Sequence, residues 1–298
     1  MLKQTIDECR GSLIERFDGQ HFQASQDELA VEEPLEIRLA YGPAQARELK
    51  SISVTMRTPG RDAELAAGFL FTEGVIRDGL DIDSISTELM EAGGNSKLWS
   101  SSARNVVTVE LAQTVEVGLG TLQRNFYTTS SCGICGKASL LALRTVCPPR
   151  RRNEFVMDPE TLCALPAKQR EAQGVFNRTG GLHAAGLFSE TGELEALQED
   201  VGRHNAVDKL IGAALLEDRV PLTDRLLLLS GRASFELLQK AVMGGIPVVA
   251  SVGAPSSLAV DVARDFDITL VGFLRDHHFN VYHGSSRIQP RELRKIEA

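Results

Sequence analysis

The residues best suited to chemistry are Cys132 and Cys135, the one closely spaced pair among five cysteines in the sequence. A Cys-x-x-Cys pair fits half of a zinc site, a dithiol redox centre, or a thiolate that carries sulfur. A structural zinc site uses four ligands, whereas Cys9, Cys147 and Cys163 stand alone. A thioredoxin-like pair opens a helix after a strand, but this pair lies among small polar residues typical of a loop. The pattern therefore favours sulfur transfer.

A sulfur carrier needs a cysteine that is both ionised and accessible, because a persulfide forms when a thiolate attacks the terminal sulfur of a donor. Gly133 and Gly136 let backbone N–H groups approach Cys132, and Lys137 adds a positive charge, so both features favour the thiolate. The second thiol could expel the sulfur as hydrosulfide by closing a disulfide. We predict that Cys132 is the carrier and Cys135 a relay or release thiol.

Three segments in the second half of the chain place small residues directly before a predicted helix. They span 199–205, 230–232 and 253–257, and the last two follow predicted strands. Such positions suit phosphate binding, although helix capping explains each segment alone equally well. The residues that we predict to bind phosphate are Arg203, His204, Ser230, Arg232 and Ser256, with Lys209 as a further cation. His183 follows two glycines and is either a ligand contact or a structural histidine.

The elements that must position these residues begin with a small α+β unit. Alternating and β-branched residues indicate strands at 35–39, 51–55 and 106–111. Residues 61–74 predict a helix whose start Asp62 can cap. Residues 1–30 are polar and lack a clear period, so we expect a loosely held arm there.

The second half predicts an α/β domain. A helix begins at Asp158 and Pro159, and Pro166 predicts that this helix is kinked or split. A hairpin at 183–198 comes next. Helices then alternate with apolar strands, the helices at 203–217, 233–243 and 256–266 and the strands at 225–229, 247–251 and 268–274. This order predicts three layers, with helices on both faces of a mixed sheet whose centre is parallel. Ligands commonly dock where such strands end, here at 273–278.

Composition and charge narrow the class of protein. The chain has 298 residues, of which 43% are hydrophobic and 24% charged, as in ordinary globular proteins. Its net charge of −8 argues against a nucleic-acid-binding surface, and the arginine run at 150–152 fits a solvated linker. The N-terminus lacks an apolar signal core, and no apolar run approaches the roughly 20 residues that span a bilayer. We therefore expect a cytoplasmic protein with no nucleic-acid or membrane partner.

Six segments resemble, in order, the formate dehydrogenase accessory sulfurtransferases, known as the FdhD family. They are 131–136, 179–185, 199–210, 230–234, 254–260 and 269–273, and the block EDVGRHNAVDKL at 199–210 is very specific. The resemblance implies a sulfur carrier that takes persulfide sulfur from a cysteine desulfurase. It passes the sulfur to the molybdenum bis(guanine dinucleotide) cofactor before that cofactor enters formate dehydrogenase.

The resemblance also assigns roles to particular residues. The family's persulfide cysteine falls on Cys132, and its cofactor-contacting stretch falls on Phe273, Leu274, Arg275, Asp276, His277 and His278. This stretch departs from the glycine-containing, basic form of some members, although Arg275 keeps one cation. The family further implies a homodimer without a permanently bound metal.

The same resemblance implies a fold. The larger domain of the family is similar to the cytidine-deaminase fold, which agrees with the predicted order of elements. We expect an N-terminal arm at 1–30, a small α+β domain at 31–127, a loop and linker at 128–152, and a cytidine-deaminase-like domain at 153–298. A zinc deaminase itself is excluded, because His183 is not followed by the required glutamate. A cofactor-binding chaperone without sulfur chemistry and a dithiol oxidoreductase stay open as alternatives.

Overall fold

The computed structural model describes residues 8–90, 104–115, 117, 143 and 155–290. The predicted sulfur loop with Cys132 and Cys135 and the linker that follows it, Cys147 included, lie outside these residues except for Leu143. Among the helices that are described, none combines the length and apolarity needed to cross a bilayer. The division into an arm, two domains and a linker stays a prediction.

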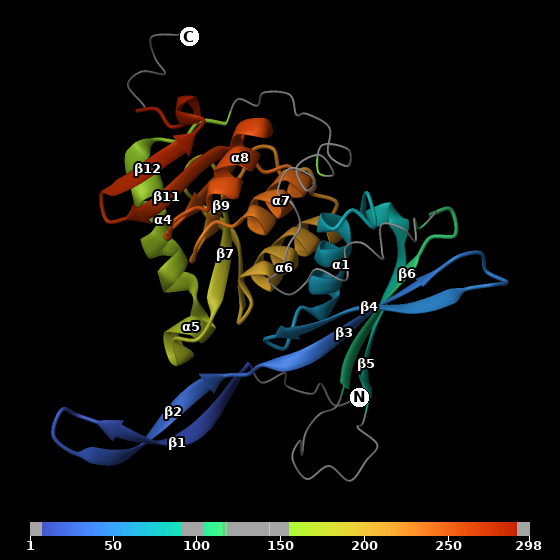
Figure 1. The fold of residues 1–298 in the computed structure, drawn as a ribbon, viewed down its shortest axis with the longest axis horizontal. Coiled ribbons are helices and arrows are strands. Elements are labelled where there is room, and N and C mark those ends of the chain that lie inside the picture. Colours follow the sequence, from blue (N-terminus) through green and yellow to red (C-terminus); the bar gives the residue numbers. More distant parts are fainter. Residues whose placement is uncertain (1–7, 91–103, 116, 118–142, 144–154, 291–298) are drawn as a thin grey trace.

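A six-stranded mixed sheet forms the centre of the larger part (Figure 1). Its strands, in spatial order, are β12 (His278–His283), β11 (Thr269–Arg275), β10 (Val248–Ser251), β9 (Leu226–Leu229), β7 (His183–Phe188) and β8 (Leu194–Asp200). β9, β10 and β11 are parallel, whereas the β7–β8 hairpin and β12 add antiparallel pairs. The predicted parallel centre and hairpin are therefore confirmed.

Helices cover both faces of this sheet. They are α4 (Pro159–Ala172), α5 (Gly174–Thr179), α6 (Arg203–Leu216), α7 (Phe235–Gly244) and α8 (Ser257–Asp265). Leu162 and Leu165 of α4 pack with Leu226 and Val248 in one hydrophobic cluster, whereas α6, α7 and α8 contribute to a larger cluster on the opposite face. The predicted α/β class is confirmed, and the likeness to the cytidine-deaminase fold stays a prediction.

A four-stranded sheet forms the smaller part and shares the larger cluster. Its strands, in spatial order, are β4 (Glu48–Arg57), β3 (Glu33–Tyr41), β6 (Arg104–Leu111) and β5 (Ile82–Met90). The turn η1 (Gly79–Asp81) precedes β5, and α1 (Asp62–Thr72) lies between this sheet and α6. The three strands and the helix that the sequence predicts here are all present.

The two parts meet where α1 crosses α6, and two glycines set the distance between these helices. A Cβ atom added at Gly68 would collide with the backbone of Asp208, and one added at Gly212 would collide with the backbone of Glu64. The helix backbones therefore touch directly at this crossing. A larger residue at either position would hold the two helices farther apart, and with them the two sheets.

Residues 9–30 form a long hairpin rather than an irregular arm. β1 (Cys9–Phe17) pairs with β2 (Phe22–Ala30) and extends away from the rest of the protein (Figure 1). Near its tip Leu13, Phe17 and Phe22 are exposed. At its base, Glu28 accepts two hydrogen bonds from Arg178 of α5, at 2.7 and 2.8 Å.

One local prediction differs from the structure. Asp62 does not cap α1, because the helix begins after Arg61, whose φ is 58°, and the Asp62 carboxylate instead pairs with Arg57. Of the two outcomes predicted at Pro166, a split does not occur, because α4 runs on to Ala172, and a kink stays a prediction. The predicted start of α4 is correct, since the Asp158 carboxylate accepts hydrogen bonds from the N–H groups of residues 160 and 161.

Two elements that were not predicted follow the last predicted strand. They are β12 and the turn η2 (Ser285–Arg287).

The glycine contact between α1 and α6 can be tested by Gly212→Ala. We expect this variant to lower the free energy of unfolding by about 3 kcal/mol, because the added methyl group must displace the backbone of α1. Gly174→Ala is the matched control, since no heavy atom lies within 4 Å of its added Cβ, and it should change stability by less than about 1 kcal/mol. Equal urea midpoints for the two variants would contradict the close contact.

Candidate functional site

Four loops of the larger sheet meet at one edge, beyond the carboxyl ends of its parallel strands. The ends of β9, β10 and β11 lie side by side there, next to the start of β7 and the end of β8. Gly253 N–H donates to the Gly231 carbonyl at 3.0 Å, and Phe273 N–H donates to the Gly253 carbonyl at 3.0 Å. We call this region, formed by 200–204, 230–234, 252–256 and 273–275, the strand-end site.

Ser230 ties the start of β7 to the end of β9. Its hydroxyl oxygen accepts a hydrogen bond from Ala184 N–H at 2.8 Å, and its own N–H donates to the Ala184 carbonyl at 3.0 Å. The neighbouring Gly231 lies against His183, because an added Cβ would come within 3.4 Å of the imidazole. Ser230 and Gly231 therefore hold the His183 ring at the edge of the sheet.

Positive charge gathers around His183. Arg203 and His204 form the first turn of α6, and the helix begins at Gly202 without a side-chain cap. Burial, followed by the charges of Arg203 and His204, lowers the pKa of His183 from its ordinary 6.5. The Arg203 Nε atom is buried, and no group in the described part of the chain bonds it. An uncapped helix start beside these cations favours an anion.

One carboxylate lies close to His204, and sequence reasoning missed it. Glu236 lies in the first turn of α7, and its Oε2 is 3.9 Å from His204 Nε2. The neighbouring His204, together with Ser234, holds the pKa of Glu236 at about 2. Glu236 lies two residues after the segment 230–234, and the local sequence contains no motif that would indicate a partner for His204.

The other predicted loop residues take different positions in the site. Arg232 is exposed, and its Cα would lie 3.1 Å from a Cβ at Gly253, so both loops are in contact there. Ser256 caps α8, because its hydroxyl oxygen accepts a hydrogen bond from Ala259 N–H at 3.2 Å. Helix capping, the alternative explanation of this segment, therefore applies to Ser256, and the Ser256 N–H donates to the Ala233 carbonyl of the neighbouring loop.

The predicted cofactor-contacting stretch divides into three parts. Phe273 is half-buried beside the Gly253 loop, at a bulge where its φ is 55°. Leu274 is fully buried in the smaller hydrophobic cluster, so its side chain is turned away from the surface. The remaining four residues, Arg275, Asp276, His277 and His278, are exposed around the turn that joins β11 to β12. Of this stretch, Phe273 lies directly against the loops of the strand-end site.

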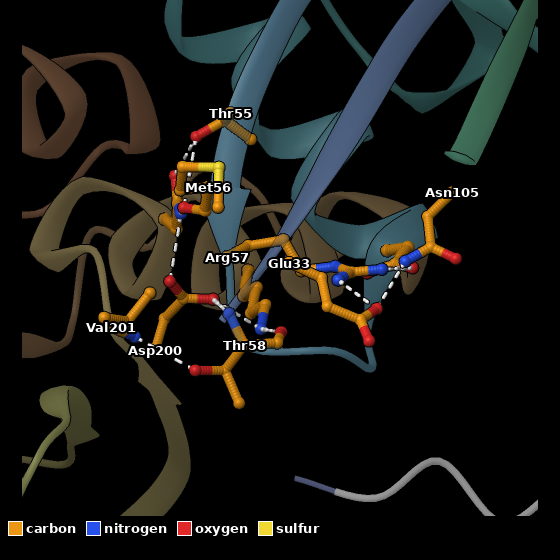
Figure 2. Close-up of polar contacts among 11 residues, drawn as sticks. Glu33, Thr55, Met56, Arg57, Thr58, Asn105, Asp200 and Val201 are labelled. Carbon is orange, nitrogen blue, oxygen red and sulfur yellow. Dashed lines mark hydrogen bonds and ion pairs between the residues drawn. The ribbon is translucent and has the colours of Figure 1, made fainter. Parts of the chain in front are cut away.

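Lys209 does not take part in the strand-end site, contrary to the sequence prediction. Its ammonium group lies 2.7 Å from Asp200 Oδ2 and donates to the Thr58 carbonyl at 2.9 Å. Its side chain is 2% exposed, so both partners hold it in the interior. The hydrogen bonds of Asp200 and Thr58 are drawn in Figure 2. Asp200 and Thr58 are among the buried residues that sequence reasoning did not single out.

Within the described residues, no cluster of three or more His, Cys, Asp or Glu side chains could hold a metal ion. Cys9 and Cys163 are half-buried, and burial raises the pKa of both thiols. Neither has the ionised character that a sulfur carrier needs. Among the described cysteines there is thus no rival to the predicted carrier.

Comparisons with known proteins identify the relatives of this chain. The model of the FdhD/NarQ family matches residues 30–289. A sulfur carrier protein FdhD of Streptomyces avermitilis is 53% identical over 272 residues, covering 89% of this chain and 90% of the relative. Another from Mycobacterium tuberculosis is 50% identical, covering 90% and 96%, and one from Sulfurisphaera tokodaii is 41% identical, covering 88% and 92%.

A solved structure supports the fold. The crystal structure of a putative formate dehydrogenase accessory protein from Desulfotalea psychrophila matches with a TM-score of 0.66. The match covers 94% of this chain and 98% of that one, at 24% sequence identity. At this level of identity the likeness concerns the arrangement of helices and strands.

Because the charge of Arg203 contributes to the lowered pKa of His183, we expect the variant Arg203→Gln to change this pKa. The pKa of His183 should rise in this variant but stay below 6.5, because burial, the larger cause, is unchanged. NMR titration of the imidazole measures this directly, and Arg225→Gln, at the opposite end of β9, is the control. The folded chain binds this proton less readily than the unfolded chain, so His183 costs stability as the pH falls below 6.5. An unchanged pKa would show that Arg203 does not act on His183.

Proposed function

Because the chain belongs to the FdhD/NarQ family, we propose that it is a sulfur carrier in the maturation of formate dehydrogenase. Cys132 would accept a persulfide sulfur from a cysteine desulfurase and pass it to the molybdenum bis(guanine dinucleotide) cofactor. One observation carries the proposal. Relatives named sulfur carrier protein share about half of their residues with this chain, and the alignment covers nearly the whole of both chains. The strand-end site, with Arg203 and Arg232, would give the acceptor a place to bind.

The acceptor carries guanine-nucleotide phosphates, and the strand-end site suits them. Arg203 and His204 would provide positive charge, and the uncapped start of α6 would provide backbone donors. Arg232 would add a further cation from the neighbouring loop. Phe273 would offer an apolar contact beside them. Ser230 and Ser256 would act mainly by fixing the loops, because their hydroxyl oxygens accept backbone hydrogen bonds.

The sulfur step itself is thiol exchange. The Cys132 thiolate attacks the terminal sulfur of the desulfurase persulfide, a new S–S bond forms on Cys132, and the desulfurase cysteine leaves as a thiolate. The terminal sulfur needs two electrons to leave as sulfide, and Cys135 would supply them by attacking the Cys132 sulfur, so that a Cys132–Cys135 disulfide forms. The released sulfide would replace an oxygen ligand of molybdenum, which leaves as water, and a cellular dithiol reductant would reopen the disulfide. The cofactor is cargo here, and the protein supplies delivery, orientation and exclusion of water.

The remaining parts of the proposal concern partners and place. The donor would be a cysteine desulfurase, the recipient formate dehydrogenase, and the working form a homodimer in the cytoplasm. No resident metal is required. The two alternatives differ in what they need: a chaperone would hold the cofactor without Cys132 chemistry, and a dithiol oxidoreductase would cycle Cys132 and Cys135 without a persulfide.

Intact-mass analysis after incubation with a cysteine desulfurase and cysteine tests the carrier role. We expect the wild-type chain to gain one sulfur atom, because the Cys132 thiolate keeps the transferred sulfur as a persulfide. Cys132→Ala should lose the gain, whereas Cys163→Ala, which removes a half-buried thiol with a raised pKa, should keep it. An unmodified wild-type chain that exchanges disulfides with thioredoxin would favour an oxidoreductase. If Cys132→Ala still matured formate dehydrogenase, the chaperone would be favoured.

A further inference from the structure

Asp200, at the end of β8, is fully buried and uses both carboxylate oxygens. Its Oδ1 accepts hydrogen bonds from Gly202 N–H at 2.8 Å and from the Asn205 side-chain amide at 2.9 Å. Both donors belong to the start of α6, on either side of Arg203 and His204. One oxygen therefore fixes the turn that carries Arg203 and His204 of the strand-end site.

The other oxygen of Asp200 reaches the smaller sheet. Oδ2 accepts from Thr58 N–H at 3.2 Å and lies 2.7 Å from Lys209 Nζ, which in turn donates to the Thr58 carbonyl at 2.9 Å. Val201 N–H donates to the Thr58 hydroxyl oxygen at 3.2 Å, so the contact runs in both directions (Figure 2). Residues 200 and 201 are thereby joined to the segment just after β4.

Asn205 extends this connection along β4. Its amide donates to the Met56 carbonyl at 2.8 Å, and its carbonyl oxygen accepts from the Thr55 hydroxyl at 3.2 Å. The β4 segment is itself rigid at this point. Arg57 is 1% exposed and makes two hydrogen bonds to Asp62, at 2.9 and 3.0 Å.

We propose that Asp200 is a positioning residue for the strand-end site, holding Arg203 and His204 where a guanine-nucleotide phosphate binds. The inference rests on the proposed function, because it concerns the same site. Asp200 is buried and does not face the ligand; it acts through the first turn of α6. An amide in place of the carboxylate has one acceptor oxygen, so it can serve Gly202 and Asn205 or Thr58 and Lys209, but not both pairs. The turn is then free to shift relative to His183 and Arg232. Small displacements of charged groups are enough to weaken binding strongly.

A second buried ion pair on the same helix provides a matched control. Asp208 Oδ1 lies 2.9 Å from Lys240 Nζ of α7 and accepts a hydrogen bond from Thr72 at 2.8 Å. Asp208 is 2% exposed, so its environment is comparable to that of Asp200. It ties α6 to α1 and α7 but does not touch the first turn. A role in stability alone would make the two aspartates equivalent for binding.

The test compares Asp200→Asn with Asp208→Asn in the full-length chain. GDP is the probe, its affinity is measured by calorimetry, and thermal unfolding is recorded for each variant. We expect both variants to lose stability, while Asp200→Asn binds GDP about tenfold more weakly and Asp208→Asn stays within about twofold of wild type. The affinity of wild type should fall with salt, and this dependence should flatten in Asp200→Asn because Arg203 and His204 no longer face the phosphates together.

Asn205→Ala gives the same information if Asp200→Asn does not fold, because it releases the first turn from β4 without leaving Lys209 unpaired. Similar GDP affinities for wild type and the Asp200 or Asn205 variant, or an equal loss in Asp208→Asn, would overturn the positioning role. A wild-type chain that takes up sulfur on Cys132 but does not bind GDP would overturn the nucleotide site together with this role. A chain that binds GDP with the expected variant effects, but takes up no sulfur, would leave Asp200 as a positioning residue and remove the carrier function.

Discussion

The buried contact of Asp200 with Lys209 and Thr58 is the interaction on which the relation between the two sheets depends. Removing an ion pair from water costs several kcal/mol for each charge, so the pair persists only where hydrogen bonds satisfy both groups. Asp200 meets this condition with donors from Gly202, Asn205 and Thr58 in addition to Lys209. Each donor has a fixed direction, and the arrangement therefore admits one orientation of α6 relative to β4.

The close crossing of α1 and α6 reinforces this constraint. Gly68 and Gly212 bring the two helix backbones into contact, which shortens the distance that the polar network must bridge. Apolar packing and polar contacts thus act at neighbouring points along one helix. The result is a support beneath the strand-end site, where Arg203 and His204 lie beside His183. Such a support suits the proposed function, in which the site would recognise the phosphates of a large cofactor.

The sequence was sufficient to predict five of the six strands of the larger sheet, because the central ones are short apolar runs between helices with clear periods. It could not predict the β1–β2 hairpin, whose residues are mostly exposed on both faces and so leave no periodic signal. Pro166 was predicted to kink or split α4, but the helix is not split, and Leu162, Leu165 and Gln169 are buried on either side of the proline. Such burial depends on tertiary packing, which no local stretch of sequence contains.

The candidate site was predictable in part, because the order of helices and strands places certain loops at the strand ends. The loops at the strand ends follow from topology, so Arg203, His204, Ser230, Arg232 and Ser256 could be named from sequence. Lys209 lies six residues beyond Arg203 and carries the same charge, yet it pairs with Asp200, and only the angle between β8 and α6 decides this. Phe273 and Leu274 are neighbours of similar character, but the bulge in β11 leaves one beside the loops and the other in the core.

The central claim, that this chain delivers sulfur to molybdenum, is tested most directly on the product. Formate dehydrogenase can be isolated from cells in which this chain is the sole member of its family, and the molybdenum ligands examined by X-ray absorption. The account predicts a terminal sulfur ligand on molybdenum with the wild-type chain and an oxygen ligand in its place with Cys132→Ala. The same terminal sulfur ligand in both enzymes would contradict it.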